Sequence, residues 1–139
     1  MNRYELGRAG EEYACRYLES LGFSITGRNV RVGHSEFDII CTDDKYIIFA
    51  EVKTRNESPD SPDRFGRPAR AVTEKKSDAL LRGAAQYIRT VGTGGRQPRI
   101  DVIEIYADTS SGFSVLKINH IKSAVVRTEK SENRYRGNR

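Results

Sequence analysis

The sequence lacks the features that mark membrane, secreted and disulfide-rich proteins. It has no run of about eighteen apolar residues, the length that a membrane-spanning helix requires. Its first six residues contain no apolar core of the kind that a secretory signal carries. Of its two cysteines, Cys15 is expected on the polar side of a helix and Cys41 in a core strand, which predicts reduced thiols and neither a disulfide nor a zinc site. We therefore expect a cytoplasmic protein that makes no use of a membrane.

Basic residues outnumber acidic ones, giving a formal net charge of +5 at neutral pH and a pI of about 9.4. The excess is uneven, because residues 127–139 hold five basic and two acidic side chains and so contribute +3. Two interpretations of this tail stay open. It is either a solvated, disordered segment that keeps the protein soluble, or a basic segment that binds the phosphate backbone of a nucleic acid.

The chain length of 139 residues allows one hydrophobic core and is too short for two ordinary domains. With 37% hydrophobic and 31% charged residues, the composition is that of a somewhat polar globular protein. We therefore expect a single domain over residues 1–126, followed by the basic tail.

Residues 36–53 contain the pattern around which the rest of the chain is organised. Two apolar segments are joined by a short polar turn at residues 43–45, which predicts a hairpin of antiparallel strands. Alternation predicts that one face of the first strand holds Glu36, Asp38 and Ile40, and the other holds Phe37, Ile39 and Cys41. On the second strand Glu51 and Lys53 share one face. Asp38 and Glu51 are therefore expected side by side.

This pair of carboxylates indicates a metal site. Two carboxylates among apolar residues repel each other and lose hydration, so they need protons, neighbouring cations or a metal ion. Mg²⁺ prefers carboxylate oxygens and keeps several waters, so Asp38 and Glu51 on rigid strands would leave room for a phosphate. The Lys53 ammonium would orient an attacking water or neutralise charge developing on phosphorus. The alternative is an ion pair of Glu51 with Lys53 that stabilises a structural or protein-interaction domain.

A first helix is predicted to begin at Asn2, whose spacing to Glu5 matches a capping box, and to end at Gly22. Its expected buried side consists of Leu6, Ala9, Tyr13, Ala14, Tyr17, Leu18 and Leu21. Glu11 lies about 20 degrees beyond Leu18, at the edge of this arc. It is either an ordinary edge glutamate or a carboxylate directed toward a strand end.

The remaining pattern predicts a first strand at 23–25 and 30–32 that is interrupted or bulged near Gly27. It also predicts strands at 99–106 and 113–118 and a second helix at 73–90. Lys75 and Lys76 lie in the first turn of that helix, where cations are unfavourable unless an anion is near. Either a phosphate contact or a solvated helix end would explain them. The turn-rich segment 54–72 carries three arginines that would fold over a bound phosphate chain or simply be flexible: Arg64, Arg67 and Arg70.

Three other polar residues have a simpler expected role. Asp101 stands beside Arg99 near the start of a strand, where pairing with the arginine is the commoner role and metal ligation the alternative. His34 lies in a polar turn with no nucleophile to activate, so we expect it to be solvated. His120, at the beginning of a short apolar segment, is interpreted as structural.

Five short motifs occur in one order: Gly10-Glu11-Glu12-Tyr13-Ala14, Arg28-Asn29, Glu36-Phe37-Asp38, Glu51-Val52-Lys53 and Arg99-Ile100-Asp101-Val102. This ordered set resembles the YraN-type family of uncharacterised bacterial proteins, within the PD-(D/E)XK nuclease superfamily, over roughly residues 7 to 106. One departure is Ser35, because the family usually has Gly directly before Glu-x-Asp; here Gly33 lies two positions earlier.

The resemblance implies an α/β fold, a restriction-endonuclease-like sandwich with a mixed central β-sheet flanked by helices. It implies cleavage of DNA with Mg²⁺ or Mn²⁺, in which Asp38, Glu51 and the Val52 carbonyl hold the metal, Lys53 is catalytic and Glu11 joins the site. Similarity to archaeal Holliday-junction resolvases suggests branched or damaged DNA, and resolving a junction usually takes a homodimer. RNA stays open as a partner, and a non-catalytic nucleic-acid-binding module with this fold is the alternative function.

Overall fold

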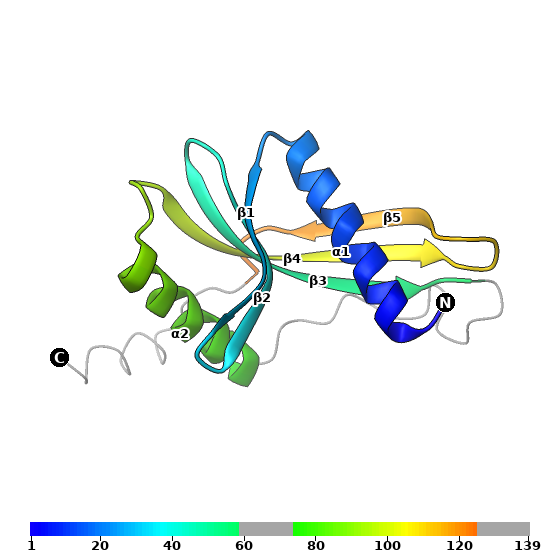
Figure 1. Ribbon diagram of the computed structural model, residues 1–139, viewed down its shortest axis with the longest axis horizontal. Coiled ribbons are helices and arrows are strands. Elements are labelled where there is room, and N and C mark those ends of the chain that lie inside the picture. The colour runs from blue at the N-terminus through cyan, green and yellow to red at the C-terminus, as the bar shows by residue number, and fades with distance from the viewer. Residues whose placement is uncertain (59–73, 125–139) are drawn as a thin grey trace.

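A five-stranded sheet and two helices make up residues 1–58 and 74–124, the part of the computed structural model described below (Figure 1). The elements are α1 (Arg3–Ser20), β1 (Ser24–Val32), β2 (Ser35–Thr42), β3 (Tyr46–Asn56), α2 (Glu74–Val91), β4 (Gln97–Asp108) and β5 (Ser114–Ile121). The strands lie in the order β1-β2-β3-β4-β5. The three arginines predicted at 64, 67 and 70 and the tail at 127–139 fall outside the described residues.

The sheet is mixed, as predicted. Three of its four strand pairs are antiparallel, and only β3 and β4 run parallel. A parallel pair needs a crossover connection, and α2 lies in the connection between these two strands. The hairpin predicted for residues 36–53 is therefore confirmed as β2 and β3, and it sits at the centre of the sheet.

The two helices cover opposite faces of the sheet (Figure 1). Ile48 and Ala50 of β3 belong to the core beneath α1, whereas Ile47 and Phe49 belong to the core beneath α2. Alternate side chains of one strand point to opposite faces, so the two cores are separated by the sheet itself. This is the predicted sandwich of helix, sheet and helix. In the described parts of the chain, neither helix is long and apolar enough to cross a membrane.

The capping box predicted at the start of α1 is present. Asn2 Oδ1 accepts a hydrogen bond from the Glu5 backbone N–H at 2.8 Å, and the Glu5 carboxylate accepts one from the Asn2 N–H at 3.2 Å. The buried face of this helix comprises Gly10, Ala14, Cys15 and Leu18. A glycine and an alanine on this face allow the helix backbone to lie close to the sheet.

The predicted rotation of α1 was partly wrong. Tyr13 and Leu21 were expected to be buried, but their exposed fractions are 39% and 50%. Cys15, expected on the polar side, is buried, so the helix is rolled toward the side that carries Glu11 and Cys15. Both cysteines are free, as predicted. Burial raises the pKa of the Cys15 thiol and raises that of Cys41 to about 12, which makes both thiols unreactive.

β2 and β3 separate at Asp38. Their paired residues run from Thr42 opposite Ile47 to Ile39 opposite Ala50 and then stop. From Glu51 onward β3 continues to Asn56 in register with β4 alone. β2 and β3 therefore diverge, and Asp38 and Glu51 lie where the divergence begins. We call the opening between Asp38 of β2 and residues 51–53 of β3 the notch.

The predicted alternation of β2 fails at the same point. Phe37 was expected to share a face with Ile39 and Cys41, but it packs with Ile40 and Phe49 in the core beneath α2. The Phe37 and Phe49 rings lie 5.1 Å apart, centroid to centroid. A strand that leaves its partner is free to twist further, and the twist rotates its side chains out of the regular alternation.

The turn into β2 accommodates Ser35, the residue that departs from the resembled family. Gly33 supplies the left-handed conformation with a φ of 60°, so Ser35 can be extended as part of the strand. The Ser35 hydroxyl donates a hydrogen bond to the Ala79 carbonyl of α2 at 2.7 Å. A Cβ at Gly83 would lie 2.8 Å from the Ser35 Cβ, so the glycine on the helix makes room for the serine on the strand.

The outer strands differ slightly from their predicted bounds. β1 is continuous and has a register shift between Ile25 and Gly27, which confirms the predicted bulge. β5 extends to Ile121, so His120 lies within a strand and not at the beginning of a separate final segment.

Candidate functional site

Asp38 is a half-buried carboxylate with one backbone partner. Its Oδ2 accepts a hydrogen bond from the Val52 N–H at 2.7 Å, across the notch. Burial raises the pKa of Asp38 to about 6, and the negative charges of Glu11, Glu51 and Glu36 act in the same direction. The bond from Val52 opposes the rise in pKa without cancelling it. Asp38 is therefore poorly neutralised by the protein.

Glu51 has one occupied and one unoccupied oxygen. Its side chain is 13% exposed, and Oε1 forms ion pairs with the Lys53 ammonium at 3.4 Å and with Lys76 of α2. Oε2 is buried and has no hydrogen-bond partner among the described residues. A buried carboxylate oxygen without a partner is costly, so this atom fits a site that is completed by a cation from outside the chain.

Lys53 and Lys76 reach Glu51 from different elements. Lys53 follows Glu51 by two residues on β3 and shares its face, as predicted, and its side chain is 48% exposed. Lys76 comes from the first turn of α2 and its side chain is 40% exposed. Lys76 was expected to contact a phosphate or to be solvated, and its contact with Glu51 is a finding of the structure. The side chain of Lys75 lies outside what the structure describes.

Glu11 is brought to the notch by close packing of α1 on β3. A Cβ at Gly10 would lie only 1.8 Å from Thr54 Oγ1, so only glycine allows the helix to approach the strand here. The charge of Glu11 acts on Asp38, as its effect on the pKa of that residue shows. Glu11 was expected to be either an ordinary edge glutamate or a carboxylate directed toward a strand end, and its charge is close enough to raise the pKa of Asp38.

Two cavities lie near the notch, and neither of them is lined by Asp38, Glu51 or Lys53. One, of about 780 Å³, is lined by Glu11 and Glu36 together with basic residues of α1 and β1. The other, of about 560 Å³, is lined by Glu11, Val52 and Thr54. Glu11 lines both cavities, and Val52, whose N–H binds Asp38, lines the second.

The residues of the notch fit a divalent cation in chemistry, and the ligand set that they offer is small. In residues 1–58 and 74–124, no group of three or more His, Cys, Asp or Glu side chains converges closely enough to hold a metal. Asp38 and Glu51 supply two carboxylates, and the Val52 backbone lies beside them. Mg²⁺ binds well through one or two carboxylates because it keeps several waters and takes phosphate oxygens from a substrate.

A second acidic group beside the site was missed by sequence analysis. Glu104 of β4 is opposite Lys53 in the parallel register and is only 2% exposed. Its carboxylate accepts hydrogen bonds from Tyr106 at 3.1 Å and Asn119 at 2.8 Å, and pairs with Arg55 at 3.5 Å. The only signal in the sequence is a glutamate flanked by two isoleucines in a core strand.

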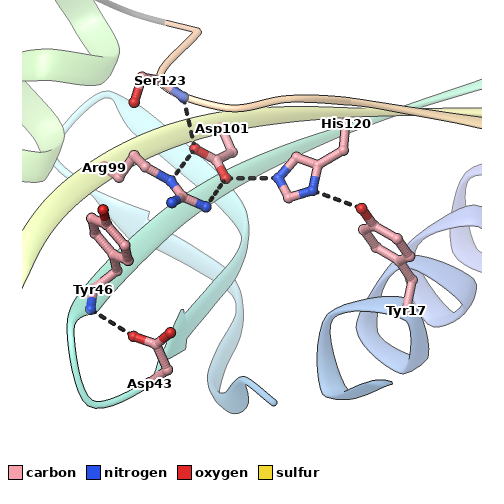
Figure 2. A network of polar contacts seen from close by, with 7 residues as sticks. All are labelled: Tyr17, Asp43, Tyr46, Arg99, Asp101, His120 and Ser123. Atoms are coloured by element: carbon pink, nitrogen blue, oxygen red, sulfur yellow. Dashed lines mark hydrogen bonds and ion pairs between the residues drawn. The ribbon is translucent and has the colours of Figure 1, made fainter. Parts of the chain in front are cut away.

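Asp101 belongs to a different network, on the α1 face of the sheet (Figure 2). Arg99 binds both of its oxygens at 2.9 Å, and the Ser123 N–H donates to Oδ1 at 3.0 Å. His120 Nε2 lies 2.7 Å from Oδ2, and His120 Nδ1 lies 2.8 Å from the Tyr17 hydroxyl. Asp101 is thus paired with arginine, the commoner role expected for it, and His120 is part of the same structural network.

Comparison with known proteins places the chain among close relatives of unassigned activity. A model of the family described as "Uncharacterised protein family UPF0102" matches residues 10–105. A UPF0102 protein of Caldicellulosiruptor saccharolyticus is 38% identical over 124 residues, which cover 89% of this chain and 99% of that protein. A UPF0102 protein of Syntrophomonas wolfei has the same identity and coverage. The matched segment contains all the acidic and basic residues of the notch.

Proposed function

This chain belongs to the uncharacterised protein family UPF0102, and we propose that it is a metal-dependent phosphodiester hydrolase that acts on DNA. The observation that carries the proposal is that the protein compensates the charges of Asp38 and Glu51 only in part. Asp38 has its pKa raised to about 6, and Glu51 keeps a buried oxygen without a partner among the described residues. A carboxyl group with a raised pKa, close to a second carboxylate that contacts two lysines, is typical of functional sites.

Asp38 and Glu51 would hold Mg²⁺ or Mn²⁺, with the Val52 carbonyl as a further ligand. When bound, the ion would supply a Lewis acid for the scissile phosphate and lower the pKa of a bound water. Lys53, half exposed and 3.4 Å from Glu51, would orient the water or stabilise charge developing on phosphorus. Glu11 would add negative charge at the cavity wall and strengthen cation binding.

The fold supports this chemistry by analogy. A mixed sheet between two helices, with acidic residues where the central strands separate, is what the resemblance to PD-(D/E)XK nucleases implies. We extend the proposal to branched or damaged DNA and to a homodimer on the same analogy. Substrate shape and oligomeric state would be measured first with a panel of linear, flapped, branched and single-stranded DNA.

The decisive test is cleavage of that panel in Mg²⁺, Mn²⁺ and Ca²⁺ by the wild type, Asp38→Asn and Lys53→Met. We expect cleavage in Mg²⁺ and Mn²⁺, slow or absent turnover in Ca²⁺, and loss of cleavage in both variants with little loss of DNA affinity. Binding to DNA without cleavage in any metal would instead support the non-catalytic nucleic-acid-binding module.

A third candidate rests on the ion pair that Glu51 forms with Lys53. If this pair and Lys76 already neutralise Glu51, the protein has little reason to bind a metal and the cluster is structural. Calorimetric titration with Mg²⁺ and Mn²⁺ separates this candidate from the hydrolase, because an internally neutralised site would give no binding heat.

A further inference from the structure

Two lysines converge on the same oxygen of Glu51, which is an unusual use of cations. Lys53 and Lys76 both contact Oε1, while Oε2 of the same carboxylate has no partner in the described parts of the chain. If the lysines served only to neutralise a buried charge, pairing one with each oxygen would do so better. Both ammonium groups therefore contact Oε1, and Oε2 remains available to another cation.

The Lys76 contact contributes little to stability. Its side chain is 40% exposed and that of Glu51 is 13% exposed, so solvent screens the lysine end of the ion pair and limits what the contact adds to stability. Lys76 also lies in the first turn of α2, where the helix dipole disfavours a cation. The contact with Glu51 therefore gives Lys76 a role beside the acidic residues of the notch.

The two lysines differ in how freely they can leave Glu51. The Lys53 backbone is two residues from Glu51 on the same strand and its side chain lies on the same face, so its ammonium has only a short distance to span to the Glu51 carboxylate. Lys76 comes from a helix on the α2 face, and its flexible four-carbon stem allows the ammonium to move by several ångströms without moving the backbone. Lys76 is the one of the pair that can be exchanged.

We propose that Lys76 is an exchangeable cation of the site, which occupies Glu51 when the metal is absent and contacts a substrate phosphate when a divalent cation takes Glu51. This proposal rests on the proposed hydrolase function. A divalent cation brought to Glu51 repels the ammonium, and a phosphate beside the metal offers it a new partner. Metal and nucleic acid should therefore bind cooperatively, through Lys76.

Thermodynamic linkage makes this testable without any cleavage. The factor by which Ca²⁺ raises affinity for a short DNA duplex must equal the factor by which the duplex raises affinity for Ca²⁺. We would measure duplex affinity with and without Ca²⁺, at constant ionic strength, for the wild type, Lys76→Gln and Lys76→Arg. Lys45→Gln is the control, since Lys45 is an exposed lysine of the β2–β3 turn, away from the notch, and its loss should leave the coupling unchanged.

Without metal, Lys76→Gln should bind DNA as the wild type does, because Lys76 is then engaged with Glu51. With Ca²⁺ it should bind about 5-fold more weakly than the wild type, the scale of one phosphate contact in a partly screened site. Lys76→Arg should restore most of the coupling because it keeps the charge. Calorimetry without DNA should show that Lys76→Gln binds Mn²⁺ about 2- to 5-fold more tightly, since a competing cation has been removed.

Equal losses of affinity with and without Ca²⁺ would overturn the proposal, because Lys76 would then be a permanent phosphate contact. No change in either condition would also overturn it and leave a purely structural ion pair. The proposed function can fail separately: coupling that depends on Lys76, in a protein that cleaves nothing, would support the exchange and reject the hydrolase. DNA cleavage, together with coupling between metal and DNA binding that is unchanged in Lys76→Gln, would support the hydrolase and reject the exchange.

Discussion

Asp38 and Asp101 are buried aspartates of the same sheet, and the protein treats them in opposite ways. Burial alone would raise the pKa of Asp101, but hydrogen bonds from His120, Arg99 and the Ser123 N–H outweigh it and lower the pKa. Asp38 receives one backbone hydrogen bond, and burial raises its pKa to about 6. The Asp101 carboxylate is therefore fully compensated by hydrogen bonds and an ion pair within the protein, whereas a bound cation would be needed to compensate the charge of Asp38.

The same contrast divides the two buried glutamates beside the notch. Both oxygens of Glu104 are satisfied, one by Asn119 and the other by Tyr106 and Arg55. Glu51 has two lysines on one oxygen and none on the other, within the described residues. A chain that can satisfy Asp101 and Glu104 so completely is able to satisfy buried acids. The incomplete charge compensation of Asp38 and Glu51 is therefore what the proposed metal site would require.

The largest effect is expected from breaking the matched network. Asp101→Ala should lower the free energy of unfolding by about 3–5 kcal/mol, because it leaves the Arg99 guanidinium and the His120 ring buried without their partner. Urea denaturation monitored by circular dichroism would measure the loss. The contribution of Asp101 should be present above about pH 4 and disappear as the pH falls through its lowered pKa. A loss below about 1 kcal/mol would contradict a stabilising role.

Substitution of Asp38 or Lys53 should reduce catalysis and leave the fold intact. Asp38→Asn and Lys53→Met should each reduce metal-dependent DNA cleavage at least about 100-fold, the scale of removing one group that acts on the reacting phosphate. Initial rates on the preferred DNA, at saturating Mg²⁺, would measure this. Lys45→Met, a lysine of the β2–β3 turn away from the notch, is the matched control and should cleave at the wild-type rate.

The third prediction is that removing the charge of Asp38 stabilises the metal-free protein. The folded pKa of about 6 lies above the ordinary value near 3.9, so the charged form destabilises the folded state above pH 6. Allowing for partial solvent screening, Asp38→Asn should raise the free energy of unfolding by about 1–2 kcal/mol at pH 8 and by nothing at pH 4. Urea denaturation in chelator at both pH values would measure it. Destabilisation at pH 8 would contradict this prediction and would show that the charge of Asp38, like that of Asp101, stabilises the folded protein.

The smallest effect is expected from metal alone. At ten times the dissociation constant, Mg²⁺ or Mn²⁺ should stabilise the wild type by about 1.4 kcal/mol, visible as a rise in Tm. Asp38→Asn and Glu51→Gln should lose most of this rise, whereas Glu104→Gln should keep it, since Glu104 is satisfied by the chain. Differential scanning fluorimetry with Na⁺ at matched ionic strength would separate specific binding from screening.

Local pattern in the sequence was enough to predict the central hairpin and the start of α1, whereas the mixed sheet was what the family resemblance implied. The first two features depend on alternation, turn residues and a capping pair, all of which act over a few positions along the chain. Asp38 and Glu51 were expected side by side from the register of this hairpin, and the pairing of β2 with β3 stops at Ile39 and Ala50, one residue before them. The match to UPF0102 covers these same positions.

Only the tertiary structure decided which distant side chains meet. The contact of Lys76 with Glu51, the position of Glu104 opposite Lys53 and the network around Asp101 each join elements whose relative placement no local pattern contains. The roll of α1 and the twist of β2 at Phe37 are settled by how the whole core packs, since a small rotation of a helix or strand exchanges buried for exposed positions. The sequence determined which acids could bind a cation; packing determined which of them the protein left unmatched.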